Sequence, residues 1–247
     1  MPRLIVAFVN ERAGLAVDVR GILFDKDGTL FDFQSTWSSW AEKVIAAHGR
    51  ADPDREALIA EAIGFDVVAR AFLPESIVIA SPFDVTAHAV HTVVGGDRDL
   101  LLSDLDALAR STPQAEVAGL QATLAHLAKD YALGVATNDS EGSTMTHLRD
   151  AGVVGHFSFI AGSDSGYGSK PAPGQLLGFA EATGLPPESI LMVGDSTHDL
   201  EAASAAGMRR VAVLTGVASS DDLRPHSDVV LPDITHLARW IAQTASP

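Results

Sequence analysis

The chain has 247 residues, 47% of them hydrophobic, and its 17 basic and 32 acidic residues give a net charge of −15. This composition predicts a folded chain with a sizeable core, and the negative charge argues against nucleic acid and anionic membranes as main partners, because both would repel it. The chain has no cysteine, which excludes disulfides and thiolate chemistry and fits a reducing compartment.

The start of the chain is open to several interpretations. The apolar run at residues 4–9 is too short for a signal-peptide core or a membrane span, so we expect a cytoplasmic protein. Residues 1–18 could be an extra strand, a loose arm, or the product of a start codon placed too far upstream. The first clear element is a buried strand at Val19–Asp25.

The next segment, up to residue 112, has a helical pattern. Asp52 precedes Pro53, and Gly64 ends the same stretch, which are N-cap, first-turn and C-cap signals of a helix. Residues 75–80 could be a short strand or part of a helix. The spacing of apolar residues predicts helices over 35–49, 53–64, 83–96 and 97–111.

From Pro113 the pattern alternates between helices and strands. We expect helices at 113–130, 143–152, 172–184, 198–208 and 234–244, with strands at 131–139, 157–164, 189–196, 209–216 and 227–232. Such alternation is typical of a parallel sheet with helices on both faces. We therefore expect an α/β fold, in which residues 1–32 and 113–247 form a core around the parallel sheet and residues 33–112 form a helical insertion that caps the strand ends.

Polar side chains gather where the predicted strands end, and ligands of open α/β sheets bind beyond these carboxyl ends. Asp25 and Asp27 follow the first strand and point to the same side. Their like charges repel, and a divalent cation is the usual group that offsets such repulsion. Lys26 points away from Asp25, so we expect no catalytic role for it. The later strands and their loops contribute Thr137, Asn138, Asp139, Lys170, Asp195 and Asp199.

Each of these residues alone has a structural explanation. Asp25 could form a turn, Thr137 and Asn138 could cap a helix, Lys170 could lie in an exposed loop, and Asp199 suits a helix start. Their occurrence together at consecutive strand ends favours a functional site.

Four segments together resemble the motifs of the haloacid dehalogenase (HAD) superfamily, in the order of that family. They are "DKDGTL" at 25–30, "VATND" at 135–139, Lys170-Pro171 and "GDSTHD" at 194–199. The resemblance covers residues 19 to about 214 and is nearest to the branch of phosphoglycolate phosphatases. It implies a Rossmann-like core, an inserted α-helical cap and a Mg²⁺-dependent phosphatase.

The resemblance also implies roles for single residues. Asp25 would be the nucleophile that forms an aspartyl-phosphate, and Asp27 the general acid and base. Thr137 and Asn138 would bind the phosphoryl group, and Lys170 would neutralise its charge. These residue types suit the chemistry, because a carboxylate can form an acyl-phosphate and so split hydrolysis into two steps.

The metal site follows from the same resemblance. Asp25, Asp195 and the backbone carbonyl of Asp27 would ligate Mg²⁺, which prefers oxygen ligands and keeps several waters. Asp199 would support the metal or its waters. Positive charge from the metal and from the lysine would then oppose the negative charge that develops during phosphoryl transfer.

Several alternatives stay open at this stage. Asp27 favours phosphoryl over halide chemistry, because a halide leaving group needs no proton. A phosphosugar mutase would use the same aspartate pair, and a non-catalytic binding protein could keep the fold. Phosphonate hydrolysis would need a Schiff-base lysine from the cap, where Lys43 shows no other sign of that role. The substrate, a small phosphorylated metabolite, could be phosphoglycolate or a sugar phosphate, and no pattern indicates an oligomeric state.

Weaker signals lie mostly in the predicted cap. Trp37 and Trp40 could line the entrance between core and cap, but packing inside the cap is the favoured interpretation. His88 and His91 have helical spacing without a third ligand nearby, so a helix face is favoured over a metal site. His198, inside "GDSTHD", could contact solvent or product, or simply begin a helix.

Overall fold

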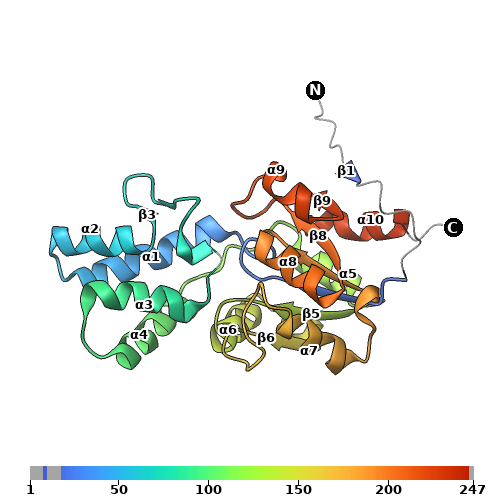
Figure 1. The fold of residues 1–247 in the computed structure, drawn as a ribbon, viewed down its shortest axis with the longest axis horizontal. Coiled ribbons are helices and arrows are strands. Elements are labelled where there is room, and N and C mark those ends of the chain that lie inside the picture. Colours follow the sequence, from blue (N-terminus) through green and yellow to red (C-terminus); the bar gives the residue numbers. More distant parts are fainter. Residues whose placement is uncertain (1–7, 10–17, 80, 245–247) are drawn as a thin grey trace.

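The computed structural model describes residues 8–9, 18–79 and 81–244 of the chain. A sheet surrounded by helices forms one part of the molecule, and four helices form a second part beside it (Figure 1). Among the described residues, no helix combines the length and the apolar character needed to cross a membrane.

Within the described residues, the larger sheet has seven strands in the order β1-β9-β8-β7-β2-β5-β6. Six are parallel, and β1 pairs antiparallel with β9 at one edge, so the predicted α/β class is confirmed. Of the ambiguous N-terminal segment, Phe8–Val9 is thus an extra strand, and the other residues up to 17 lie outside the described part. The strands are β1 (Phe8–Val9), β2 (Gly21–Phe24), β5 (Ala132–Ala136), β6 (Phe159–Ala161), β7 (Ile190–Gly194), β8 (Arg209–Val213) and β9 (Val229–Leu231).

Strand β2 lies in the middle of the sheet and is buried on both faces. Ile22 lies opposite Leu133 of β5 and Leu191 of β7, and all four residues of β2 are buried. A strand covered on both faces is expected to be apolar throughout, as this one is. The strand therefore holds the residues that follow it, starting with Asp25, at a fixed place at the carboxyl-terminal end of the parallel strands.

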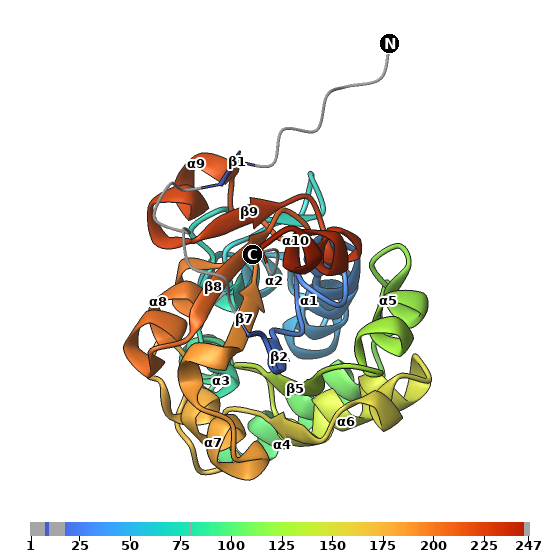
Figure 2. The same ribbon diagram turned by 90° about the vertical axis from the view of Figure 1, so that its right-hand side faces the viewer.

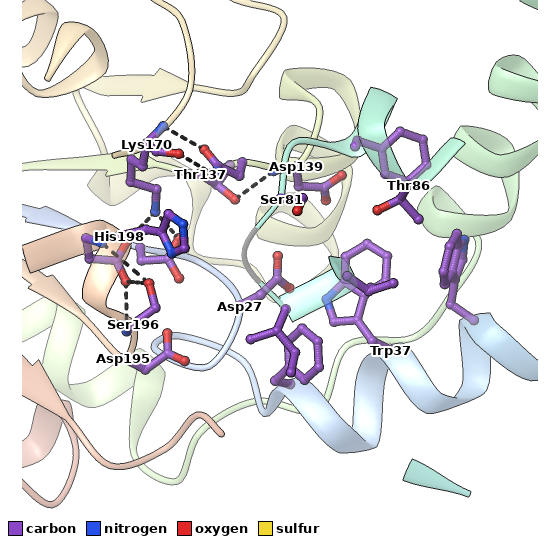
Figure 3. Close-up of a pocket in the computed structure, with 18 residues that line it drawn as sticks. Asp27, Trp37, Ser81, Thr86, Thr137, Asp139, Lys170, Asp195, Ser196 and His198 are labelled. Carbon is purple, nitrogen blue, oxygen red and sulfur yellow. Dashed lines mark hydrogen bonds and ion pairs between the residues drawn. The ribbon is translucent and has the colours of Figure 1, made fainter. Parts of the chain in front are cut away.

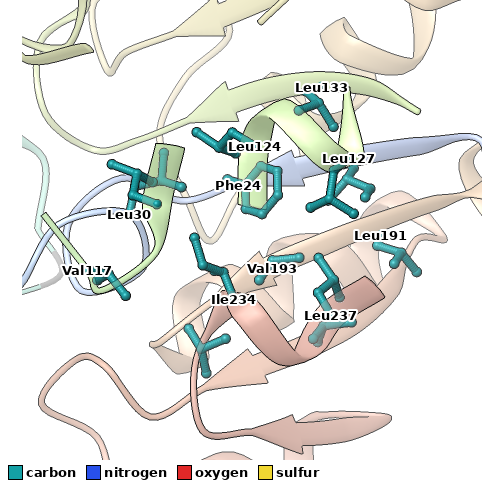
Figure 4. Packing of buried hydrophobic residues seen from close by; sticks show 14 of the residues in the cluster. Phe24, Leu30, Val117, Leu124, Leu127, Leu133, Leu191, Val193, Ile234 and Leu237 are labelled. Atoms are coloured by element: carbon teal, nitrogen blue, oxygen red, sulfur yellow. The ribbon is translucent and has the colours of Figure 1, made fainter. Parts of the chain in front are cut away.

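Helices cover both faces of the sheet (Figure 2). Phe24 packs with Leu124 and Leu127 of α5 and Leu237 of α10 on one face (Figure 4). The opposite face, which includes Leu23, packs against α7 and α8. The helices are α5 (Leu120–Leu127), α6 (Glu141–Asp150), α7 (Gly174–Thr183), α8 (Thr197–Ala206), α9 (Ser220–Leu223) and α10 (Leu237–Thr244).

The helix expected from residue 113 begins later, at Leu120. Gly119 precedes it with φ of 80°, a conformation that disfavours other residues. Before it the chain is extended, because the Val117 amide donates to the Leu30 carbonyl and Glu116 bridges to Phe31. The apolar residues of this segment therefore belong partly to the extended chain, such as Val117 in the core of the sheet, and partly to the helix.

The second part of the molecule is a helical block with its own core. Trp40, Ile59 and Leu105 are fully buried in that core. The predicted caps are present, since the Asp52 side chain accepts hydrogen bonds from the first turn of the helix that Pro53 begins. The four helices are α1 (Phe33–Gly49), α2 (Pro53–Ala62), α3 (Phe83–Val94) and α4 (Arg98–Arg110).

The block also contains a short hairpin that the sequence pattern did not predict. Strands β3 (Phe65–Asp66) and β4 (Ala71–Phe72) pair antiparallel, and the Asp66 side chain accepts hydrogen bonds from the Val68 and Ala69 amides in the turn. Phe65 and Phe72 stack edge to face with ring centroids 5.1 Å apart. Residues 77–79, expected as a strand or helix, form a 3₁₀ turn.

Candidate active site

The carboxyl ends of β2, β5 and β7 meet at one edge of the sheet, facing the helical block. A cavity lies at this edge, and helices α1 and α3 of the block form part of its wall (Figure 3). All seven site residues predicted from the sequence line this cavity: Asp25, Asp27, Thr137, Asn138, Lys170, Asp195 and Asp199.

Lys170 lies between two carboxylates at the base of the cavity. Its Nζ is 2.6 Å from Asp25 Oδ1 and 2.6 Å from Asp199 Oδ1, and the lysine is almost fully buried. Burial alone would lower its pKa, but the charges of Asp199 and Asp25 outweigh that effect and raise the pKa above its usual value. Lys170 therefore stays charged where a phosphoryl group could approach.

The acidic residues form one compact cluster. Carboxylate oxygens of Asp25, Asp195 and Asp199 lie within 4.8 Å of one another, and all three residues are buried. The pKa of Asp25 is raised to about 7, mainly by burial; Lys170 opposes this rise, and the charges of Asp199 and Asp27 add to it. Burial and the charge of Asp25 also raise the pKa of Asp195 well above its usual value. This clustering is favourable only if further positive charge enters the site.

Two glycines make room for Asp195. A Cβ at Gly216 would lie 1.7 Å from Asp195 Oδ2, and a Cβ at Gly28 would lie 2.3 Å from the same oxygen. Thr29 Oγ1 donates to Asp195 Oδ1 over 3.3 Å. The carboxylate is thus held in a cradle that any larger residue at either glycine would fill. The set of buried oxygen donors in this cradle suits a hard divalent cation such as Mg²⁺.

Asp27 differs from Asp25 in its surroundings. One of its oxygens, Oδ2, is 3.0 Å from Lys26 Nζ, and the other, Oδ1, is buried without a hydrogen-bond partner among the described residues. Asp27 faces the cavity (Figure 3). An unpartnered carboxylate oxygen at a cavity wall is available to exchange a proton with a bound molecule.

Lys26, for which the sequence predicts no catalytic role, has a defined place beside the site. It is completely buried, and its Nζ lies 2.8 Å from Asp139 Oδ2 and 3.1 Å from His147 Nδ1. Burial would lower its pKa, but Asp139 and Asp27 raise it above the usual value. His147 Nε2 lies 3.0 Å from the Ala109 carbonyl, so this network joins the sheet to α4.

The loop after β5 orders the remaining polar groups. The Asp139 amide donates to Thr137 Oγ1 over 3.1 Å. The Asn138 side chain accepts from the Lys170 amide and donates to the Lys170 carbonyl, each over 2.9 Å. Asn138 thus fixes the backbone of Lys170, and its expected contact with phosphate stays a prediction.

The helix that follows β7 fixes Asp199. Its Oδ2 accepts from the amide and the hydroxyl of Ser196, over 3.0 and 2.7 Å, in a capping box at the start of α8. Its Oδ1 is left for Lys170. His198, in the same turn, also lines the cavity, whereas His88 and His91 do not.

The two tryptophans of the helical block have different surroundings. Both are buried in the core of the block, as expected, and both also reach the cavity. The Trp40 Nε1 donates to the Leu105 carbonyl over 3.2 Å. The Trp37 Nε1 has no partner among the described residues, and its ring lies 5.5 Å from Lys26 Nζ.

Comparison with known proteins agrees with this site. The family model described as haloacid dehalogenase-like hydrolase matches residues 22–213. A phosphoglycolate phosphatase of Rhodospirillum rubrum is 28% identical over 225 residues, which cover 90% of each chain. A phosphoglycolate phosphatase of Neisseria gonorrhoeae is 30% identical over 240 residues, covering 87% of this chain and 92% of that protein. The chain therefore belongs to the haloacid dehalogenase-like hydrolase family.

Solved structures show the same fold. The L-2-haloacid dehalogenase from Xanthobacter autotrophicus matches with a TM-score of 0.62 and 18% identity, covering 91% of this chain and 98% of the other. The sequence-based prediction of a HAD phosphatase is confirmed at the level of enzyme class by the curated relatives.

Proposed function

We propose that the protein is a Mg²⁺-dependent phosphatase that hydrolyses a small phosphorylated metabolite through an aspartyl-phosphate at Asp25. The observation that supports this most is the shared cavity of Asp25, Lys170 and Asp27. In it, a buried carboxylate lies against a buried lysine, and a second carboxylate presents an unpartnered oxygen. The names of the relatives make phosphoglycolate one candidate substrate, and a sugar phosphate is another.

The chain's own residues account for both halves of the reaction. Lys170 and the Thr137 hydroxyl bind the phosphoryl oxygens. An Asp25 oxygen attacks phosphorus, the bond from phosphorus to the ester oxygen breaks, and Asp27 gives its proton to the leaving alkoxide. Asp27, now a carboxylate, then takes a proton from water as the water oxygen attacks the phosphorus of the aspartyl-phosphate. Phosphate leaves, and both aspartates return to their starting states.

Asp25, Asp195 and the backbone carbonyl of Asp27 would hold Mg²⁺, supported by Asp199. The metal would neutralise the charges of the carboxylates and of the phosphoryl group. We place this activity in the cytoplasm, on a small molecule, without nucleic acid or membrane as a partner. The helical block at 33–112 would act as the cap over the core at 1–32 and 113–247.

Phosphate release from a panel of phosphorylated metabolites tests the proposal, with Mg²⁺ or chelator, for the wild type and for Asp25→Asn. We expect release that requires the metal and is lost in the variant, because the amide cannot attack phosphorus. Release that survives in Asp25→Asn would contradict the assignment. Phosphoryl transfer on the panel without net release would indicate a mutase, and binding without turnover a non-catalytic protein.

A further inference from the structure

The wall of the cavity opposite the aspartates is contributed by the helical block. It is made largely of aromatic and aliphatic side chains, with two hydroxyl groups, those of Ser81 and Thr86 (Figure 3). The apolar members include Phe33, Val78 and Ile79. Because the phosphoryl group is bound at the strand ends, this wall faces the leaving group of the substrate.

Among the described residues of the cavity, no free positive charge faces the leaving group. Among the described residues that line the cavity, Lys170 is the only lysine or arginine, and both of its close carboxylates, Asp25 and Asp199, belong to the phosphoryl end. His198 is the other lining side chain that can become cationic, and it lies on the sheet side, at the start of α8.

A carboxylate on the leaving group would therefore be poorly accommodated. It would lose water against an apolar wall without gaining a counter-charge, which is unfavourable for any buried ion. An uncharged group with a polar oxygen avoids this cost and can use the hydroxyls of Ser81 and Thr86.

The wall also offers one unused hydrogen-bond donor. Trp37 is 5% exposed, and its Nε1 has no partner among the described residues. Figure 3 shows Trp37 and Asp27 facing the same space. Buried donors are nearly always partnered in folded proteins, so a free one at a cavity wall points to a ligand atom that completes it.

We infer, given the proposed phosphatase activity, that the substrate is a phosphate monoester of an uncharged alcohol, with an oxygen on the leaving group that accepts a hydrogen bond from Trp37 Nε1. Phosphoglycolate, which carries a carboxylate at that position, is disfavoured. The inferred substrate of this chain thus differs from phosphoglycolate, which the names of its relatives indicate as their substrate.

A pair of nearly identical esters tests the charge preference. Phosphoglycolate and 2-hydroxyethyl phosphate differ by a carboxylate in place of a hydroxymethyl group. With Mg²⁺ at about pH 8, we expect kcat/KM to be at least about tenfold higher for 2-hydroxyethyl phosphate. Equal values, or a preference for phosphoglycolate, would overturn the inference alone. If neither ester nor p-nitrophenyl phosphate released phosphate, the proposed function would fail and the inference with it.

Trp37→Phe tests the hydrogen bond, because it removes the N–H and keeps an aromatic ring. We expect KM for 2-hydroxyethyl phosphate to rise about fivefold, the effect of one neutral hydrogen bond. KM for ethyl phosphate, which lacks the accepting oxygen, should not change. Trp240→Phe is the matched control, because Trp240 is similarly buried and its Nε1 also has no partner among the described residues, but it lies in the sheet core away from the cavity. Equal effects of Trp37→Phe on both esters, or equal effects of the two variants, would overturn the role of Trp37.

Discussion

Lys26 gives the most quantitative prediction of this structure. It is 0% exposed and lies within 3.1 Å of three partners, Asp27, Asp139 and His147. In Lys26→Met, the similar apolar chain remains, but Asp139 and Asp27 keep buried negative charge without the ammonium. Removing one partner of a buried ion pair typically costs about 3–5 kcal/mol. In a chain of this size each kcal/mol shifts the melting temperature by roughly 2–4 °C, so we expect a decrease of about 6–20 °C.

Urea unfolding with a double-mutant cycle provides the assay. Lys26→Met and Asp139→Asn should each destabilise the protein. The double variant should lose clearly less than the sum, because both charges of the Lys26–Asp139 pair are then removed and only Asp27 is left without the ammonium. Lys129→Met, at an exposed position, is the control and should change stability by less than about 0.5 kcal/mol. A loss below about 1 kcal/mol for Lys26→Met, or additive losses in the cycle, would refute the structural role assigned to Lys26.

Two further predictions concern the acidic cluster. Gly216→Ala should weaken Mg²⁺ binding, measured by calorimetry, because its Cβ would overlap Asp195 Oδ2. The control is Gly155→Ala, which has nothing within 4 Å of the added Cβ and should bind Mg²⁺ as the wild type does. Equal affinities of the two variants would contradict the role of Gly216 in making room for Asp195. Without metal, the raised pKa of Asp25 means that the folded state holds a proton more tightly than the unfolded one. This contribution of Asp25 to stability is complete below about pH 4 and is lost as the pH rises through about 7. In urea titrations, the free energy of unfolding of the wild type should therefore fall over this pH range relative to that of Asp25→Asn. Parallel pH dependences of the two proteins would contradict the raised pKa of Asp25.

Most of the phosphoryl end of the site could be predicted from the sequence, because all of its residues except Lys170, which lies in the loop between β6 and α7, directly follow a buried strand or begin a helix. Asp25 follows β2, Thr137 follows β5 and Asp195 follows β7, and adjacent parallel strands necessarily bring these residues together. The strands were recognisable because they are apolar on both faces. The alternation of helices and strands was therefore enough to predict most of the fold.

Other features depend on contacts that no local pattern contains. Lys26 contacts Asp139 and His147, which lie 113 and 121 residues away in the sequence. The local sequence therefore predicted only that its side chain points away from Asp25. The free N–H of Trp37 depends on which atoms surround it in three dimensions. The hairpin at Phe65 and Phe72 is too short for alternation to stand out, and it is stabilised by packing on the helical block.

The central claim is that Asp25 becomes covalently phosphorylated during turnover. We would quench the Mg²⁺-loaded enzyme during turnover of a substrate it hydrolyses, reduce any acyl-phosphate with borohydride, and locate the modified residue by peptide mass spectrometry. We predict a reduced side chain at position 25 in the wild type and none in Asp25→Asn. A wild-type enzyme that turns over without modification at Asp25, or with modification at another residue, would contradict the proposed mechanism.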